Sequence, residues 1–383
     1  MSTKKDIIAD ALMSIVERAQ SGGPVTRIGL MASGSELGSE ELLNGARLAQ
    51  STNPGLKVVA IGKKIDAYDD LEWFETDDNE EAISKGLEDA LAQGVVAGAV
   101  ALHYPFPIGV ATIGRVVTPA RGKPLFIASC TGTTASQRGE ALLRNALYGI
   151  ATAKACGIAK PTVAFLNIDG AGPVLRALTK MIESGYEATL GTSIRGDGGS
   201  LLRGNDLVTG GVDVLVCDTL TGNMLIKLFA TYTSGGQYET TGWGYGPSVG
   251  ENWKSIVSII SRASGAPVIA NALSLTAQAA QAGLPALVND ELKSARTAGF
   301  DDAVTSLAPK AAVQQETVQK PAAVPVDEQI AGVDVLEMDD AAVSLWKVGI
   351  YAEAAMGCTG PVIRVASADL EKAEKILREN GYI

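Results

Sequence analysis

Short apolar runs alternate along the chain with segments in which apolar residues recur every three or four positions. Apolar runs bounded by glycine and polar residues predict buried strands, and the periodic segments predict amphipathic helices. Strands alternating with helices are typical of parallel strands joined by crossovers, so the pattern predicts a layered α/β sheet. The strands are predicted at 27–32, 56–62, 97–102, 124–128, 162–167 and 212–217, and the helices at 7–19, 39–50, 79–93 and 220–231.

The last third of the chain changes character twice. After a glycine-rich stretch at 234–250, the pattern predicts helices at 254–262 and 271–282. Residues 307–326 are rich in Pro, Ala, Gln and Lys and poor in large apolar side chains, which is typical of a linker. We therefore expect a main α/β domain at 1–306, a linker at 307–326 and a small α/β C-terminal unit at 327–383.

Helical spacing also organises this C-terminal unit. Ala342, Leu345, Trp346 and Ile350 recur at helical intervals, which predicts a helix over 339–356 with an apolar face that could dock the unit on the main domain. Gly357 fits the C-cap of that helix, because glycine readily adopts the left-handed conformation found there. A strand at 362–365 and a closing helix complete the prediction.

Composition and charge narrow the function classes. The 383 residues carry a formal net charge of −11, which disfavours binding to a nucleic-acid backbone and suits a metabolic role. The chain has one histidine and four cysteines without a CxxC pair, so no metal site and no cofactor are expected. No signal peptide is recognisable, and the longest apolar stretch, 94–102, is too short to span a bilayer. A cytoplasmic location, without a membrane partner, is expected.

The clearest chemical pattern is the segment VDVLVCDTLTGNMLIKLF at 212–229, in which a buried strand ends at Asp218. Ligands of open α/β sheets bind at the carboxyl ends of strands, and the N–H groups of a following helix favour an anion. Asp218 is therefore a candidate to hold or accept a proton, and Lys227 to face a phosphate. The alternative is that Asp218 only caps the helix. Thr221, Gly222 and Asn223 complete the candidate phosphate site.

Two further segments carry polar groups after predicted strands. The sequence SCTGTT at 129–134 offers Thr131 and Thr133 to an anion and Cys130 as a nucleophile, or forms a hydroxyl-rich turn with a structural thiol. His103, in ALHYPFPIG, is a candidate to orient an acyl group in one pocket with Thr131 and Thr133, or a structural histidine. Cys156 and Cys217 are interpreted as packing residues.

Several segments together resemble a known family. The segments MASGSELGSEELLNGARLA, KPTVAFLNIDGAG, GTSIRGDGGSLLRGNDL and the strand with Asp218 and its TGN turn resemble the phosphate acyltransferase PlsX and, more distantly, phosphate acetyltransferases, in the same order over roughly the first 300 residues. The resemblance implies a two-lobed α/β fold like those of isocitrate dehydrogenase, isopropylmalate dehydrogenase and PlsX.

The C-terminal segment AEAAMGCTGPVI at 352–363 is not a PlsX feature. With it, the whole chain is similar to the smaller, acyl-carrying subunit of component C of the glycine/sarcosine/betaine reductase complex. That resemblance implies an acetyl thioester on Cys358, inorganic phosphate as substrate and acetyl phosphate as product. It implies the larger component C subunit and the selenoprotein component as partners, and leaves homo-oligomerisation open. A helix ending just before Cys358 would disfavour its thiolate.

Two other functions stay open from the sequence. One is a conventional phosphate acyltransferase that uses acyl carrier protein or coenzyme A and needs no covalent cysteine. The other is a non-catalytic scaffold subunit that only docks partners, for which no acyl or phosphate turnover is expected.

Overall fold

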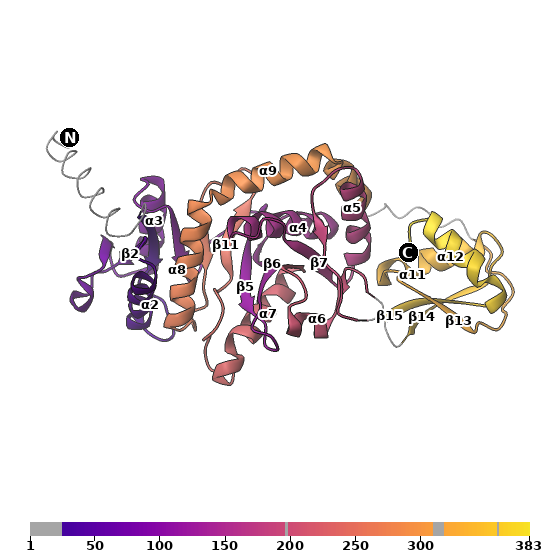
Figure 1. Ribbon diagram of the computed structural model, residues 1–383, viewed down its shortest axis with the longest axis horizontal. Coiled ribbons are helices and arrows are strands. Elements are labelled where there is room, and N and C mark those ends of the chain that lie inside the picture. Colours follow the sequence, from indigo (N-terminus) through magenta and orange to yellow (C-terminus); the bar gives the residue numbers. More distant parts are fainter. Residues whose placement is uncertain (1–24, 196–197, 309–317, 358–359) are drawn as a thin grey trace.

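The computed structural model describes residues 25–195, 198–308, 318–357 and 360–383, where a large mixed sheet and a small antiparallel sheet form an α/β fold (Figure 1). The predicted helix at 7–19 lies outside the described residues. In the described chain the large sheet contains 12 strands: β1 (Thr26–Met31), β2 (Leu56–Gly62), β3 (Glu72–Glu75), β4 (Gly98–Ala101), β5 (Val110–Val117), β6 (Pro124–Thr133), β7 (Thr162–Leu166), β8 (Thr189–Leu190), β9 (Leu201–Leu202), β10 (Val214–Val216), β11 (Gly246–Gly250) and β12 (Val257–Ile259).

The order of the strands is β3-β2-β1-β4-β12-β11-β5-β6-β10-β7-β8, with β9 also paired to β7. The strands from β3 to β12 are mutually parallel, and so are those from β6 to β8. The prediction of parallel strands is correct for these two flanks and wrong in the middle, where β11 and β5 pair antiparallel to each other and to their outer neighbours. The two flanks therefore run in opposite directions, and their carboxyl ends lie at opposite edges of the sheet.

Helices cover both faces of the sheet. The helices of the main domain are α2 (Ser39–Thr52), α3 (Glu80–Ala92), α4 (Arg138–Ala155), α5 (Ala171–Glu183), α6 (Gly204–Thr209), α7 (Thr219–Thr231), α8 (Ala266–Gln281), α9 (Leu284–Thr297) and α10 (Phe300–Leu307). In Figure 1, α4 and α9 lie on one side of β5 and β6, and α7 lies on the other. Alternation along β6 explains this, because Phe126 and Ala128 pack in the cluster beneath α4 while Ile127 packs with Ile226 of α7. Cys130 also packs on the α7 side, because the register between β5 and β6 shifts after Ala128.

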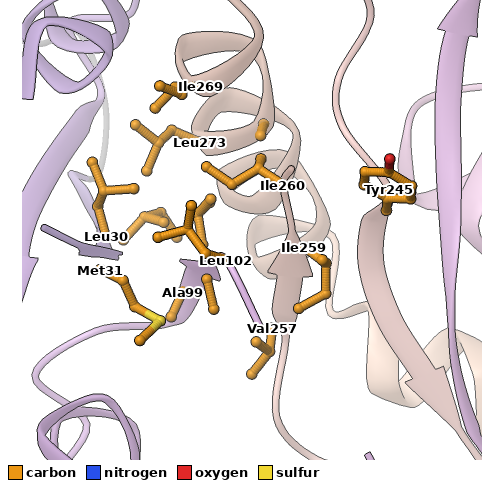
Figure 2. Close-up of a cluster of buried hydrophobic side chains, with 14 of the residues drawn as sticks. Leu30, Met31, Ala99, Leu102, Tyr245, Val257, Ile259, Ile260, Ile269 and Leu273 are labelled. Carbon is orange, nitrogen blue, oxygen red and sulfur yellow. The ribbon is translucent and has the colours of Figure 1, made fainter. Parts of the chain in front are cut away.

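The first flank of the sheet packs against α8. Leu30, Ala99 and Val257 come from three neighbouring strands, and all are fully buried. Figure 2 shows Leu30 on the side of Ile269 and Leu273 of α8, whereas Ala99 and Val257 lie on the opposite side of the strands. Burial of these aliphatic side chains supplies the hydrophobic stabilisation of this half of the domain.

The segment 254–262, predicted as a helix, contains β12 instead. Its apolar residues, Ile256, Val257, Ile259 and Ile260, are spaced like one face of a helix, but all four are buried. A strand buried on both faces has no polar alternation to reveal it, so its period resembles that of a helix. β12 pairs with β4 in parallel and places Ser261 just beyond its carboxyl end.

The C-terminal unit has its own sheet and core. It contains β13 (Glu328–Ala331), α11 (Met338–Trp346), β14 (Ala352–Gly357), β15 (Gly360–Val365) and α12 (Leu370–Glu379), and its strands are ordered β13-β15-β14. Buried Ile330, Leu345, Ile363, Val365 and Leu377 form a cluster distinct from those of the main domain.

The predicted helix at 339–356 is wrong in its second half. α11 ends at Trp346, Gly349 adopts a φ of 79°, and β14 begins at Ala352. A glycine in the left-handed conformation commonly ends a helix, and the spacing of apolar residues alone does not reveal it. Ala342, Leu345 and Ile350 are buried in the unit's own core, so they do not form the docking face that the sequence suggested. Gly357 is not a helix C-cap, because it pairs with Gly360 across the β14–β15 hairpin.

Candidate functional site

Asp218 caps the N-terminus of α7. Its carboxylate accepts hydrogen bonds from the Thr221 backbone N–H at 3.0 Å and from the Thr221 hydroxyl at 2.8 Å. The Arg138 guanidinium lies 3.6 Å from the same carboxylate. Asp218 therefore caps the helix, which was the alternative interpretation from the sequence, and the Arg138 cation lies beside it. The carboxylate takes up donors that the helix would otherwise offer to an anion.

A network of hydroxyl and amide groups fixes α7 against β6. The Thr219 hydroxyl lies 2.9 Å from the Ser129 hydroxyl and donates to the Gly132 carbonyl. The buried Asn145 amide donates to the Ser129 hydroxyl at 3.3 Å, and the Asn223 amide donates to the Cys130 carbonyl at 3.2 Å. The amide N–H of Asn223 that reaches β6 is thus engaged with the protein backbone.

Gly222 lies where α7 approaches β6 most closely. A Cβ atom at this position would stand 1.8 Å from the Ser129 carbonyl oxygen, far inside van der Waals contact. Close packing alone therefore accounts for glycine here. Thr131 lies nearby on β6, with its hydroxyl 3.0 Å from that of Thr112, and Thr133 ends the strand with an exposed side chain.

Lys227 lies at the other end of α7. It follows Asp218 by nine positions, which corresponds to about 13 Å along the axis of an α-helix. The ammonium donates to the Ser261 hydroxyl at 3.0 Å and lies 3.5 Å from the Glu239 carboxylate. The structure therefore does not bring Lys227 together with Asp218, Thr221 and Asn223, and places it instead beyond the carboxyl end of β12.

Glu239 is a fully buried carboxylate with three partners. Besides Lys227, it accepts hydrogen bonds from the Ser264 hydroxyl at 2.7 Å and from the Tyr245 hydroxyl at 3.2 Å. Burial, together with this carboxylate, raises the pKa of Tyr245. A buried charge needs such partners, so Glu239 fixes the position of the half-exposed Lys227 ammonium.

The loops after β1 and β12 meet beside Lys227. The Arg262 carbonyl accepts hydrogen bonds from the Glu36 backbone N–H at 2.8 Å and the Ser35 hydroxyl at 3.1 Å. The Arg262 side chain is exposed. Two cations and a hydroxyl, those of Lys227, Arg262 and Ser261, therefore lie in the loop after β12 and the end of α7, which is a suitable set of groups for binding an anion.

His103 follows β4, at the edge of the sheet opposite to Asp218. Its Nε2 lies 3.1 Å from a Glu80 carboxylate oxygen and 3.5 Å from the Ser84 hydroxyl. It lines a cavity of about 570 Å³ with Tyr104 and Glu88. The structure thus places His103 apart from Thr131 and Thr133, with which it was grouped in one candidate pocket.

Of the cysteines in the described residues, none has the surroundings of a reactive thiolate. Cys130 and Cys217 are fully buried, and burial raises the pKa of both thiols. Burial also raises the pKa of Cys156, to about 11. Cys358 lies outside the described residues. The residues before it form β14, so the expected helix C-terminus is absent there and its dipole no longer opposes a thiolate.

The C-terminal unit contacts the N-terminus of α5. The buried Asp334 carboxylate accepts from the backbone N–H groups of Gly170 at 3.1 Å and Gly172 at 3.3 Å. The Arg176 guanidinium pairs with Glu337 at 2.7 Å. A cavity of about 310 Å³ lies at this contact, and its lining includes Pro361 of β15.

Sequence reasoning missed Ser261, Glu239 and Asn145. Ser261 was hidden by the wrong helix at 254–262, and Glu239 lay in the glycine-rich stretch at 234–250, where no single residue was chosen as a candidate. A strand ending in Ser-Arg would have indicated a site at this edge of the sheet. In the described chain no helix is both long and apolar enough to cross a bilayer.

Comparison with known proteins agrees with this architecture. The family described as "Fatty acid synthesis protein" matches residues 26–364. The chain is 46% identical to glycine/sarcosine/betaine reductase complex component C subunit alpha of Peptoclostridium acidaminophilum, over 100% of both chains. It is also 31% identical to a phosphate acyltransferase of Staphylococcus epidermidis, over 38% of this chain and 46% of that one, and 29% identical to one of Clostridium acetobutylicum, over 38% and 44%. The chain therefore belongs to the fatty acid synthesis protein family, together with the component C alpha subunit that it resembles along its whole length.

Proposed function

We propose that the protein is the acyl-carrying subunit of a reductase complex of the glycine, sarcosine and betaine type, and that it transfers an acetyl group from a cysteine thioester to phosphate. The observation that carries the proposal is how much of the chain each group of relatives matches. The phosphate acyltransferases match 153 residues of the chain, whereas component C subunit alpha matches all of it, including the C-terminal unit with Cys358. Similarity to phosphate acyltransferases supports phosphate as the proposed acceptor of the acyl group.

The proposed transfer balances as a simple acyl exchange. A phosphate oxygen attacks the thioester carbonyl of acetylated Cys358, the C–O bond forms and the C–S bond breaks. The thiolate leaves, and the proton lost by phosphate goes to the thiolate or to solvent. Thiolate is a good leaving group, so neither an oxidant nor a metal is needed for this step.

Phosphate binds, in this proposal, at the carboxyl end of β12. Lys227, Arg262 and Ser261 offer two cations and a hydroxyl there, and buried Glu239 fixes Lys227. Asp218, with Thr221, Gly222 and Asn223, is the second candidate position, and its part is to hold a proton or to keep α7 in place. The cap that Asp218 forms makes the Lys227 position the stronger one.

The geometry of the sheet fits a two-lobed domain like those of isocitrate dehydrogenase and PlsX. In this proposal β11 and β5 join one lobe, built on β1, β2 and β4, to another built on β6, β10 and β7. Lys227 and Ser261 then belong to different lobes and meet between them. The linker at 307–326 and the unit at 327–383 complete the proposed domain division.

The C-terminal unit is proposed to move between partners. A flexible chain of about 20 residues has a root-mean-square span of about 25 Å. That span would let Cys358 collect the acetyl group from the larger component C subunit, itself supplied by the selenoprotein, and return it to the phosphate site. The alternative is permanent docking at α5.

Intact-mass spectrometry after incubation with acetyl phosphate tests the function. We expect one acetyl adduct on the unaltered protein, none on Cys358→Ala, and a normal yield on Cys130→Ala. A normal adduct on Cys358→Ala would reject the covalent role of this cysteine. A conventional acyltransferase would show no adduct but would exchange acyl groups between phosphate and coenzyme A or acyl carrier protein.

A further inference from the structure

A cavity lies where the C-terminal unit docks on the main domain, and both parts form its walls. It has a volume of about 310 Å³. One wall includes residues that follow β7 and β9, and the other consists of residues 331–335 and Pro361. Because neither part encloses the cavity alone, it exists only while the unit is docked.

Two hydrogen-bond donors stand side by side on the main-domain wall. Leu166 of β7 pairs in register with Leu202 of β9, so Asn167 and Arg203 are the next residues of two adjoining strands. Both line the cavity. Among the described residues, no hydrogen bond holds the Asn167 side-chain amide and no ion pair holds the Arg203 guanidinium. The two side chains are therefore available to a group inside the cavity.

The rest of the lining disfavours a free anion. Asp169 and Asp334 also line the cavity, so its walls carry two carboxylates and one cation, and phosphate would be repelled. Ile168, Leu201 and Val333 supply apolar contacts. The cavity therefore suits a neutral group that has a hydrogen-bond acceptor and a small apolar part.

The chain connects this cavity to Cys358. Pro361, on the wall that the unit provides, follows Cys358 by three positions. Cys358 lies outside the described residues, but it is bonded to Gly357, which pairs with Gly360. Three residues span at most about 11 Å, so a group carried on its sulfur is close to the cavity whenever the unit is docked.

We propose that this cavity binds the acetyl group of the Cys358 thioester, with the Asn167 amide and the Arg203 guanidinium donating hydrogen bonds to the carbonyl oxygen. The inference rests on the thioester proposed above and adds the place where the loaded unit is held. The ligand is a neutral, short acyl thioester, and its methyl group packs against the apolar part of the lining.

Such a cavity couples acetylation to docking. The hydrogen bonds and the buried methyl group exist only in the docked state, so the acetylated unit docks more tightly than the unit with a free thiol. One hydrogen bond and one methyl group together change an equilibrium constant about tenfold or more. The loaded unit is thus withdrawn from the partner subunit that supplied the acetyl group, and the discharged unit is released to collect another.

Hydrogen-exchange mass spectrometry on the full chain measures this coupling. The Gly170 and Gly172 amides donate to Asp334 in the docked state, so their exchange reports undocking. The protein is loaded with acetyl phosphate, and intact mass confirms the adduct. Exchange of the peptide that contains both glycines should become about tenfold slower on loading.

Substitutions identify the donors. Asn167→Ala and Arg203→Ala should each reduce the slowing, because each removes one hydrogen bond to the carbonyl oxygen. Arg121→Ala is the matched control, since Arg121 is exposed and does not line the cavity, and it should leave the slowing unchanged. Circular dichroism of each variant checks that the fold is intact.

A chemical mimic separates this inference from the proposed function. Iodoacetamide places a carbonyl group on the Cys358 side chain without acyl transfer, whereas methyl methanethiolsulfonate adds a methylthio group that has no carbonyl. The first product should show slowed exchange, and the second should not. If acetyl phosphate leaves no adduct, the proposed function fails, and the iodoacetamide product still tests the cavity. Equal exchange in that product and the unaltered protein would overturn the inference, and so would slowing that persists in both Asn167→Ala and Arg203→Ala.

Discussion

The Arg176 guanidinium on α5 lies 2.7 Å from the Glu337 carboxylate of the C-terminal unit, and Asp334 accepts hydrogen bonds from Gly170 and Gly172 of the same helix start. These contacts are polar, whereas the apolar residues of the unit pack into their own core. Partly exposed ion pairs contribute about 0.2–1 kcal/mol and weaken with salt. Contacts of this kind are suited to reversible docking.

Replacing Asp334 by Ala should loosen the docked unit. The carboxylate occupies the start of α5, and loss of such a cap costs about 1 kcal/mol, which is roughly a fivefold change in an equilibrium constant. Hydrogen-exchange mass spectrometry should show faster exchange in the peptide that contains Gly170 and Gly172. Asp339→Ala, at an exposed position of α11, should leave that peptide unchanged. Equal exchange in both variants would mean that Asp334 does not hold the unit.

A disulfide between positions 172 and 334 tests movement of the C-terminal unit. A Cβ atom on Gly172 would lie 3.5 Å from the Cβ of Asp334, which falls within the range of disulfides. The oxidised Gly172→Cys, Asp334→Cys protein should lose turnover with its partner subunits and regain it on reduction. Gly172→Cys alone, under the same oxidation, is the control. Full turnover by the locked protein would show that Cys358 works from one fixed position.

The thiols should differ sharply in reactivity. Burial raises the pKa of Cys156 to about 11 and raises that of Cys130 and Cys217 as well. At pH 8, a thiol with a pKa of about 11 is only about 0.1% thiolate. Titration of the native protein with a chromogenic disulfide should therefore detect one fast thiol, which Cys358→Ala removes. A fast thiol that persists in Cys358→Ala would contradict this assignment.

Lys227 and Asp218 should affect phosphate use differently. Lys227→Ala removes a cation from the proposed phosphate site and should raise KM for phosphate or arsenate about tenfold, the typical effect of losing one charge-assisted hydrogen bond. Asp218→Asn keeps an acceptor for the helix cap and should slow transfer to phosphate, with less effect on thioester formation. Steady-state kinetics with arsenate separates these outcomes. Unchanged KM and kcat in both variants would reject both positions.

Gly222→Ala should strongly destabilise the protein. Its added methyl group would meet the Ser129 carbonyl at 1.8 Å, so α7 must shift away from β6. Overpacking of this kind costs about 1–3 kcal/mol, and more where backbone atoms collide. Gly204→Ala is the matched control, because a Cβ at Gly204 meets no atom within 4 Å. Thermal unfolding should show a lower Tm for the first variant only.

Local sequence signals were sufficient for much of the fold. The strand before Asp218 and the helix after it appear where the apolar pattern predicts them, and so do β1, β2 and α2. In these elements the apolar residues are regularly spaced, and glycine or polar residues mark both ends. In contrast, β11 consists of Gly246–Gly250 and contains proline, so it resembles a turn until its long-range partners are known. Antiparallel pairing of β5 and β11 is a tertiary feature that no local pattern encodes.

The surroundings of Asp218 were predicted in part. Asp218 and its cap follow from the strand–turn–helix pattern, and the structure confirms the cap. The pairing of Lys227 with Ser261 and Glu239 was not predicted, because these residues are 34 and 12 positions apart in the chain from Lys227 and meet only when the sheet is assembled. Nine helical positions separate Lys227 from Asp218, so the sequence alone already places the two side chains too far apart to share one phosphate site.

The junction between β11 and β12 is short. Only Gly246 with Ile259 and Pro247 with Ser258 are in register there, and Pro247 has no N–H to donate. By comparison, β5 and β6 are joined along seven residue pairs. With two residue pairs in register, β12 is joined to β11 over a shorter length than β6 is joined to β5. The Lys227–Ser261 hydrogen bond therefore adds a side-chain tie between α7 and the loop after β12, on the two sides of this short junction.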